Sequence, residues 1–199
     1  MPDPVLYYIR HGETEWNVEG RLQGRYDIAL NARGRRQAAA CGPILADLIA
    51  RDGHALATIA FVSSPLSRAR ETMELMRASV GLEATAYRVD ARLAELSFGD
   101  WEGLTLAEVR AREPAALAER ERDKWRFVPP DGESYEQLSR RMRDWYAELT
   151  ADTVVVAHGG TARVLMVALG IAAPRAAPNT PIDQGVVYRL ATGHMTLHR

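Results

Sequence analysis

The sequence predicts a three-layer α/β sandwich, with a largely parallel central sheet flanked by helices. Short apolar segments rich in β-branched residues, at 5–9, 58–62 and 153–157, have the composition of strands buried on both faces. Helical patterns alternate with these segments along the chain, which is typical of a parallel sheet covered by helices. A length of 199 residues with 47% hydrophobic content is enough for one core of ordinary size. We therefore expect residues 1–199 to form a single domain.

Capping residues predict where several helices begin. Asn31 and Ser134 each precede an amphipathic pattern, and Ser134 opens a capping-box sequence. The segment at 63–65 (SSP) offers an N-cap serine and a proline for the first helical position, which predicts a helix beginning there. Two runs with strand character, at 186–190 and 195–198, predict a hairpin at one edge of the sheet.

The charge balance indicates the kind of partner. The 25 basic and 26 acidic side chains nearly cancel, so the chain lacks the overall positive field that nucleic acid or an anionic membrane would require. The longest apolar stretch, near residues 164–173, is too short to cross a bilayer, and the first residues do not have the pattern of a signal peptide. We therefore expect a cytoplasmic protein that binds a small anion. Charge and hydrophobicity leave open whether the protein is a homodimer.

The predicted sheet suggests where the functional site lies. Ligands of such sheets bind beyond the carboxyl ends of the parallel strands. The polar residues that follow the three best strands are Arg10 with His11, Arg68, and His158 with Gly159 and Gly160. We therefore expect two histidines and two arginines to converge, although His11 and His158 are far apart in the sequence.

These residue types fit phosphoryl transfer. Arginine offers a planar fork that binds two phosphate oxygens, which suits Arg10 and Arg68. A histidine that is largely neutral at cellular pH can attack phosphorus without a separate base, which suits His11. His158 and the glycine amides after it can stabilise charge on the equatorial oxygens. Glu95 is our candidate for the carboxyl group that protonates the leaving oxygen and later deprotonates water.

Simpler interpretations compete with each of these roles. Arg68 has the spacing of a surface ion pair with Glu71 on one helix. His11 and His158 could together bind a metal, although the sequence has none of the usual zinc spacings. Composition alone does not select Glu95 over the other two nearby acidic residues, Asp100 and Glu102.

The motif Arg10-His11-Gly12-Glu13-Thr14, followed by Trp16-Asn17, resembles the signature of the histidine phosphatase superfamily, which includes the cofactor-dependent phosphoglycerate mutases. Further blocks resemble that family in order, so that the resemblance extends from residue 5 to about residue 169. These blocks are 20–25 (GRLQGR), 30–34 (LNARG), 63–72 (SSPLSRARET), 94–103 (AELSFGDWEG), 130–134 (PDGES) and 156–160 (VAHGG).

The resemblance implies a phosphoglycerate mutase-like fold and assigns roles to the matching positions. It implies that His11 is phosphorylated, that Glu95 rather than Asp100 or Glu102 handles protons, and that no metal or other cofactor is needed. The residues that it places on the phosphoryl group are Arg10, Arg68 and His158. It adds three loop residues as phosphate or substrate contacts: Asn17, Gln23 and Gly24.

Two departures from the mutase branch favour hydrolysis. Where the mutases have an arginine and a lysine that hold the substrate, this chain has Leu96 and Leu106. The block around Glu95 is similar to the branch that includes α-ribazole and broad-specificity phosphatases. We therefore expect a phosphomonoester hydrolase that acts on a small phosphorylated metabolite. The alternatives are a phosphoglycerate mutase and a non-catalytic protein that binds phosphorylated ligands.

Overall fold

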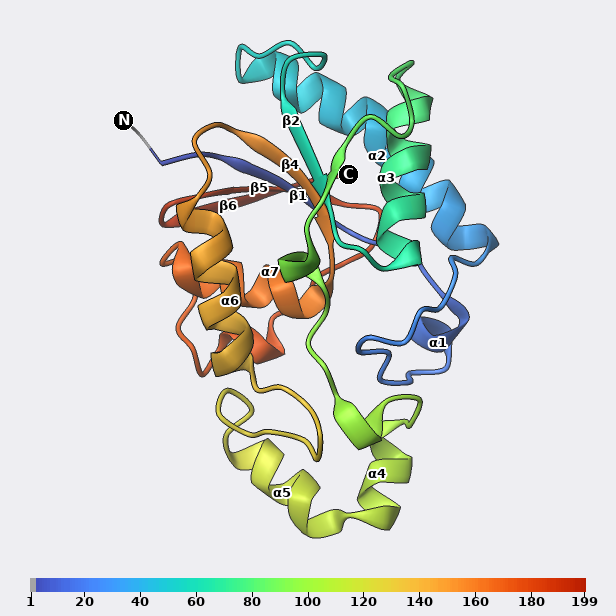
Figure 1. The fold of residues 1–199 in the computed structure, drawn as a ribbon, viewed down its shortest axis with the longest axis vertical. Coiled ribbons are helices and arrows are strands. Elements are labelled where there is room, and N and C mark those ends of the chain that lie inside the picture. The colour runs from blue at the N-terminus through green and yellow to red at the C-terminus, as the bar shows by residue number, and fades with distance from the viewer. Residues whose placement is uncertain (1–2) are drawn as a thin grey trace.

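The protein is built on a six-stranded sheet with the order β3-β2-β4-β1-β5-β6 (Figure 1). The computed structural model describes residues 3–199. The strands are β1 (Leu6–Arg10), β2 (Ala60–Ser63), β3 (Arg88–Val89), β4 (Thr153–Ala157), β5 (Val187–Ala191) and β6 (His194–His198). The first four strands along that order pair in parallel, and β5 and β6 form an antiparallel hairpin beside β1. The expected largely parallel sheet with an edge hairpin is confirmed.

Helices cover both faces of this sheet, as Figure 1 shows. Alternate residues of β1 separate the two layers, because successive side chains of a strand point to opposite faces. Tyr7 and Ile9 pack with α2 (Ala32–Arg51) and α3 (Ser67–Ser79), whereas Leu6 and Tyr8 pack with α6 (Tyr135–Ala147) and α7 (Gly159–Ala168). The predicted three-layer sandwich is therefore confirmed.

Local hydrogen bonds explain most of the helix starts. The Asn31 side chain accepts a hydrogen bond from the backbone of α2, and Ser134 forms the expected capping box at the start of α6. A short helix that the sequence did not predict, α1 (Glu15–Val18), begins with a second capping box, formed by Thr14 and Asn17.

The predicted start of α3 was wrong. The helix begins at Ser67, and Leu66 occupies the N-cap position without a side-chain cap. Ser63 is instead the last residue of β2 and pairs with β4, so the chain needs the next residues to turn away from the sheet. The hydroxyl of Ser64 contacts a histidine on the neighbouring strand end and accepts only a long hydrogen bond from the Leu66 backbone, at 3.3 Å.

Helices α4 (Leu106–Arg112) and α5 (Pro114–Arg122) form a lobe that extends away from the sheet, at the bottom of Figure 1. The lobe has a hydrophobic cluster of its own, centred on Trp101, Val109 and Leu117. Two larger clusters lie on the two faces of the sheet. That residues 1–199 form a single domain stays a prediction.

The segment that follows β1 is pressed against the first turn of α2. A Cβ atom on Gly34 would lie 2.1 Å from the carbonyl oxygen of Glu13, and a Cβ atom on Gly12 would lie 2.3 Å from the carbonyl oxygen of Gly34. The Asn31 backbone also donates a hydrogen bond to the Glu13 carbonyl, at 2.9 Å. Glycine at position 34 thus allows the helix to fix the chain immediately after His11.

Gly34→Ala should destabilise the protein, even though alanine is the better helix former by about 1 kcal/mol. The added methyl group meets backbone atoms that cannot rotate away, so we expect a net loss on the order of 1–3 kcal/mol, measured by thermal or denaturant unfolding. Ala40→Gly, at an exposed position of the same helix, isolates the propensity effect. A raised melting temperature for Gly34→Ala would contradict the proposed close packing.

Candidate active site

The carboxyl ends of β1, β2 and β4 bring together residues that are distant in sequence. Parallel pairing places Arg10 beside Ala157 and Ser63 beside Val156, so the residues that follow the three strands lie at one edge of the sheet. The rings of His11 and His158 are 5.2 Å apart between their centroids. The structure therefore places the two predicted histidines next to each other.

His11 is buried with one ring nitrogen already engaged. Its side chain is 3% exposed, and Nδ1 lies 2.7 Å from the carbonyl oxygen of Gly12. Because a carbonyl can only accept, Nδ1 carries the proton and Nε2 keeps its lone pair. Burial, together with the positive charges of Arg68 and Arg10, holds the pKa of His11 well below its ordinary value. The ring is therefore neutral at cellular pH, with a free nucleophilic nitrogen.

His158 is also buried and neutral. Burial is the main cause of its lowered pKa, followed by the charge of Arg68. Its Nε2 lies 2.7 Å from the hydroxyl of Ser64, while Nδ1 has no hydrogen-bond partner among residues 3–199. The hydroxyl of Tyr8 accepts from the His158 backbone N–H at 2.9 Å and lies 2.6 Å from its carbonyl oxygen. Strand β1 thus fixes the backbone of the second histidine directly.

Arg68 is fully buried, and its guanidinium group is directed by backbone carbonyls. It donates to the carbonyl oxygens of Gly24 at 2.8 Å and Tyr26 at 2.7 Å. Burial lowers the pKa of Arg68 to about 10, so the group is still charged at pH 7. The alternative of a surface ion pair with Glu71 is wrong, because Glu71 pairs with Arg35 at 2.6 Å.

Arg10 completes a set of buried nitrogens that have no hydrogen-bond partner among residues 3–199. One terminal nitrogen donates to the carbonyl oxygen of Ile182 at 2.8 Å. Its Nε is buried without a partner in the described chain, as are the Nε of Arg68 and the Nδ1 of His158. Both guanidinium nitrogens can only donate, and buried polar groups are rarely left unsatisfied in native proteins, so these nitrogens beside two histidines indicate a site for an anion.

Glu95 lies beside this group. Its carboxylate accepts a hydrogen bond from the backbone N–H of Gly160 at 3.1 Å and another from Leu96 at 2.8 Å. A Cβ atom on residue 160 would lie 2.3 Å from Glu95 Oε1, so any side chain there would displace the Glu95 carboxylate. The charge of Glu95 raises the pKa values of Arg10 and Arg68, against the larger effect of burial. Gly160 thus contacts the candidate proton carrier directly.

The two acidic alternatives are placed differently. The carboxylate of Glu102 accepts hydrogen bonds from the backbones of Arg25 and Phe98, each at 3.0 Å, and so fixes the loop. Asp100 is exposed to solvent. Of the three acidic residues, only Glu95 is bonded to the segment that follows His158.

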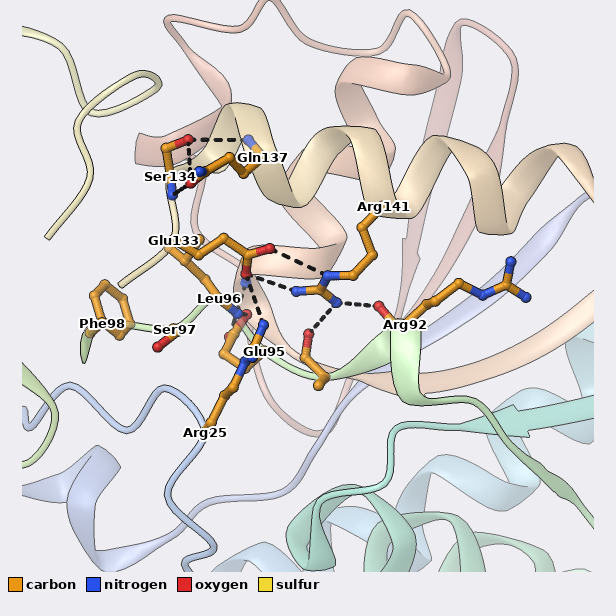
Figure 2. Close-up of polar contacts among 12 residues, drawn as sticks. Arg25, Arg92, Glu95, Leu96, Ser97, Phe98, Glu133, Ser134, Gln137 and Arg141 are labelled. Atoms are coloured by element: carbon orange, nitrogen blue, oxygen red, sulfur yellow. Dashed lines mark hydrogen bonds and ion pairs between the residues drawn. The ribbon is translucent and has the colours of Figure 1, made fainter. Parts of the chain in front are cut away.

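Arg141 and Glu133 hold the segment that carries Glu95, as Figure 2 shows. Arg141 donates to the carbonyl oxygens of Arg92 and, at 2.9 Å, Ala94, and it forms an ion pair with Glu133 at 2.8 Å. The Glu133 backbone donates to the carbonyl oxygen of Ser97. Sequence reasoning missed this role of Arg141, because the pattern of an amphipathic helix does not distinguish one arginine from another.

The three loop residues suggested by the family resemblance line the same side of the sheet. The Gln23 side chain is buried and accepts a hydrogen bond from the hydroxyl of Thr14 at 3.0 Å. Asn17 accepts from the side chain of Gln184 at 2.8 Å. The carbonyl of Gly24 binds Arg68. Their contact with a substrate stays a prediction, as do the catalytic roles of the other predicted residues.

Two kinds of feature are absent from residues 3–199. No group of three His, Cys, Asp or Glu side chains is arranged to bind a metal ion. No helix in that range is long and apolar enough to cross a membrane.

Known proteins resemble this chain over most of its length. A glucosyl-3-phosphoglycerate phosphatase of Mycobacterium tuberculosis is 38% identical over 178 residues, which cover 82% of this chain and 74% of the relative. A 2,3-bisphosphoglycerate-dependent phosphoglycerate mutase of Afipia carboxidovorans is 30% identical over 200 residues, covering 96% and 93%. The crystal structure of the α-ribazole phosphatase from Shigella flexneri superimposes with a TM-score of 0.80 at 26% identity, covering 97% of this chain and 94% of that one.

The model of one family matches residues 6–197, which include every site residue described above. That match agrees with the arrangement of two neutral histidines and two arginines at the sheet edge. The chain belongs to the histidine phosphatase superfamily, branch 1.

Proposed function

We propose that the protein hydrolyses phosphomonoesters of small metabolites through a phosphohistidine intermediate on His11. The observation that supports this most directly is the pair of buried arginine Nε groups without acceptors in the described chain, which lie beside two neutral histidine rings. The phosphatases among its relatives act, by their names, on small phosphorylated molecules. The geometry of the site agrees with two successive in-line displacements at phosphorus.

In the first step, His11 Nε2 attacks phosphorus while Arg10, Arg68 and His158 bind the equatorial oxygens. The hydrogen bond from His11 Nδ1 to the Gly12 carbonyl oxygen keeps the ring oriented while positive charge develops on the ring. Glu95 in its protonated form gives its proton to the leaving oxygen, and the leaving group departs as a neutral alcohol.

In the second step, the Glu95 carboxylate takes a proton from water as the water oxygen attacks the phosphohistidine. The phosphorus–nitrogen bond breaks, inorganic phosphate leaves, and Glu95 is protonated again for the next cycle. Apart from the substrate and water, every reacting group in this cycle is a side chain of the protein.

Phosphoglycerate mutase activity is the second candidate, because a mutase is 30% identical over nearly the whole chain. The two positions at which the family resemblance places substrate-holding cations in mutases are leucines here. Leu96 is packed into the core beside α6 and α7, and Leu106 is at the exposed start of α4. Hydrolysis is therefore favoured, and incubation with 3-phosphoglycerate and bisphosphoglycerate distinguishes transfer to a second phosphoglycerate from release of phosphate.

His11→Ala should abolish turnover of an aryl phosphate such as p-nitrophenyl phosphate, because it removes the nitrogen that forms the proposed covalent intermediate. The wild-type protein, quenched with acid during turnover of a ³²P-labelled substrate, should carry acid-labile label on the peptide that contains His11. A chelator present throughout tests independence from metals. His194→Ala, at an exposed histidine, is the control and should keep full activity. Normal turnover by His11→Ala would exclude the mechanism.

Glu95→Gln should slow alkyl phosphates far more than aryl phosphates, since a poor leaving group depends most on a proton donor. We expect a loss on the order of 10²–10⁴-fold in kcat for alkyl substrates. Asp100→Asn, at an exposed acidic residue in the same loop, is the matched control. If Glu95→Gln reduced both substrate classes by the same factor, Glu95 would not be the donor.

His11 should stay neutral as the pH falls through about 6.5, the ordinary pKa of histidine. Its lowered pKa means that the folded protein resists protonation, whereas the unfolded chain takes up a proton near pH 6.5. The free energy of unfolding should therefore decrease below that pH. Nitrogen-15 NMR of labelled histidine should show an Nδ1-protonated neutral ring at about pH 6, with His11→Ala identifying the signal. Half-protonation of that signal near pH 6.5 would contradict the assignment.

A further inference from the structure

We propose that Arg141 and Glu133 are positioning residues for the proton transfers of the reaction, because they hold the backbone on both sides of Glu95. The proposal rests on the phosphatase function proposed above and adds two residues to it. Both residues act through Glu95 and not by contact with the phosphoryl group. Their loss should therefore affect the step that needs a proton, and not the attack of His11.

The segment that carries Glu95 has no regular structure of its own. Residues 94–98 belong to neither a helix nor a strand, so their peptide groups lack the repeating hydrogen bonds that fix a helix or a sheet. A carboxyl group that serves a leaving oxygen and then a water molecule must be held within about 0.5 Å of its working position. The support for Glu95 must therefore come from other parts of the chain.

That support comes from α6 and from the turn that precedes it, as Figure 2 shows. Before Glu95, the carbonyl oxygen of Ala94 accepts a hydrogen bond from Arg141 Nη1 at 2.9 Å. After Glu95, the carbonyl oxygen of Ser97 accepts one from the backbone N–H of Glu133 at 2.9 Å. The segment is thus fixed on both sides of the proposed proton carrier.

An ion pair joins the two supports to each other. Arg141 Nη2 lies 2.8 Å from Glu133 Oε2, and Arg141 Nε donates to Glu133 Oε1 at 3.4 Å. The guanidinium group therefore binds the carboxylate through two nitrogens and keeps Nη1 for the backbone. The two side chains are only 19% and 15% exposed, which separates this pair from the mobile pairs of the surface. A lysine, with a single nitrogen, could not make the same set of contacts.

The charge of Arg141 offers a competing explanation. Burial is the main cause of the lowered pKa of His158, and the charge of Arg141 contributes a smaller part in the same direction. Arg141→Lys separates the two explanations, because it keeps the positive charge and loses the planar fork. If geometry is what matters, lysine should not replace arginine.

The test compares kcat/KM for p-nitrophenyl phosphate and glycerol 3-phosphate, because the alkyl leaving group depends more strongly on a proton from Glu95. Arg141→Lys and Arg141→Ala should each lower kcat/KM for glycerol 3-phosphate by roughly 10- to 100-fold, the loss expected when a catalytic group is displaced by about 1 Å. The value for p-nitrophenyl phosphate should stay nearly unchanged. A residue that only stabilised the fold would lower both values together.

A second readout uses the Glu95→Gln protein. If Arg141 acts through Glu95, adding Arg141→Lys to Glu95→Gln should cause no further loss with glycerol 3-phosphate, whereas independent effects would multiply. Glu133→Gln keeps the shape of the side chain and removes its charge, so it should reproduce the selective loss. It carries the test if thermal melts show that the Arg141 variants do not fold. Arg140→Gln is the matched control, because it removes an exposed ion pair with Glu136 on the same helix and should leave both substrates unchanged.

Three results would overturn the proposal and leave the phosphatase function in place. They are an equal loss for the two phosphates, a further loss in the Glu95→Gln background, and full activity of Arg141→Lys. If Glu95→Gln itself slowed both phosphates equally, the assignment of the proton donor would fail, and the positioning role with it. If the wild-type protein did not turn over p-nitrophenyl phosphate, the proposed function would fail.

Discussion

The parallel alignment of β4 between β1 and β2 is the constraint on which the site depends. The three strands end at one level, so Arg10, Ser64 and His158 meet at the same edge of the sheet. A slip of one residue would turn the side chains that follow each strand to the opposite face. The hydroxyl of Tyr8 bonds to both backbone groups of His158 and so reinforces this register from within the core. The register of the sheet thus sets the distance between the two histidine rings.

That edge of the sheet holds more positive charge than the acidic side chains around it neutralise. Arg68 is buried and bound only by carbonyl oxygens, and Arg10 has one such contact. The combined field and the burial keep His11 and His158 neutral, which is the form that a nucleophile and a hydrogen-bond donor need. A phosphate dianion would accept hydrogen bonds from the arginine Nε groups that lack acceptors in the described chain and would offset this concentrated charge. The same arrangement supports the proposal that the site binds phosphate and that His11 attacks it.

The sequence was most informative where local chemistry decides the structure. The buried strands, the cap at Asn31 and the capping box at Ser134 all depend on a few neighbouring residues, and the structure has each of them. The helix expected at Ser63 failed because pairing with β4 extends the strand through that residue, which is a long-range effect. His11 and His158 could be predicted as site residues because each directly follows a strand.

The residues that sequence reasoning missed lie on helix faces. All but one of the 25 basic side chains are arginines, so nothing in the sequence separates Arg141 and Arg163 from those exposed to solvent. Their roles depend on which helix packs against which loop. The structure shows that Arg141 holds the Glu95 segment and that Arg163 lies against Gly159.

The proposed phosphoryl site and the space beyond Glu95 are built from different parts of the fold. The phosphoryl site is built from β1, the turn after β2, and the start of α7, where glycines allow Glu95 and the arginines to approach the backbone. The space beyond Glu95 is bounded instead by the lobe, whose hydrophobic cluster is separate from those beside the sheet. The separate hydrophobic cluster allows the lobe to vary without changing the packing around His11. This separation agrees with the presence of both a phosphatase and a mutase among the relatives of this chain.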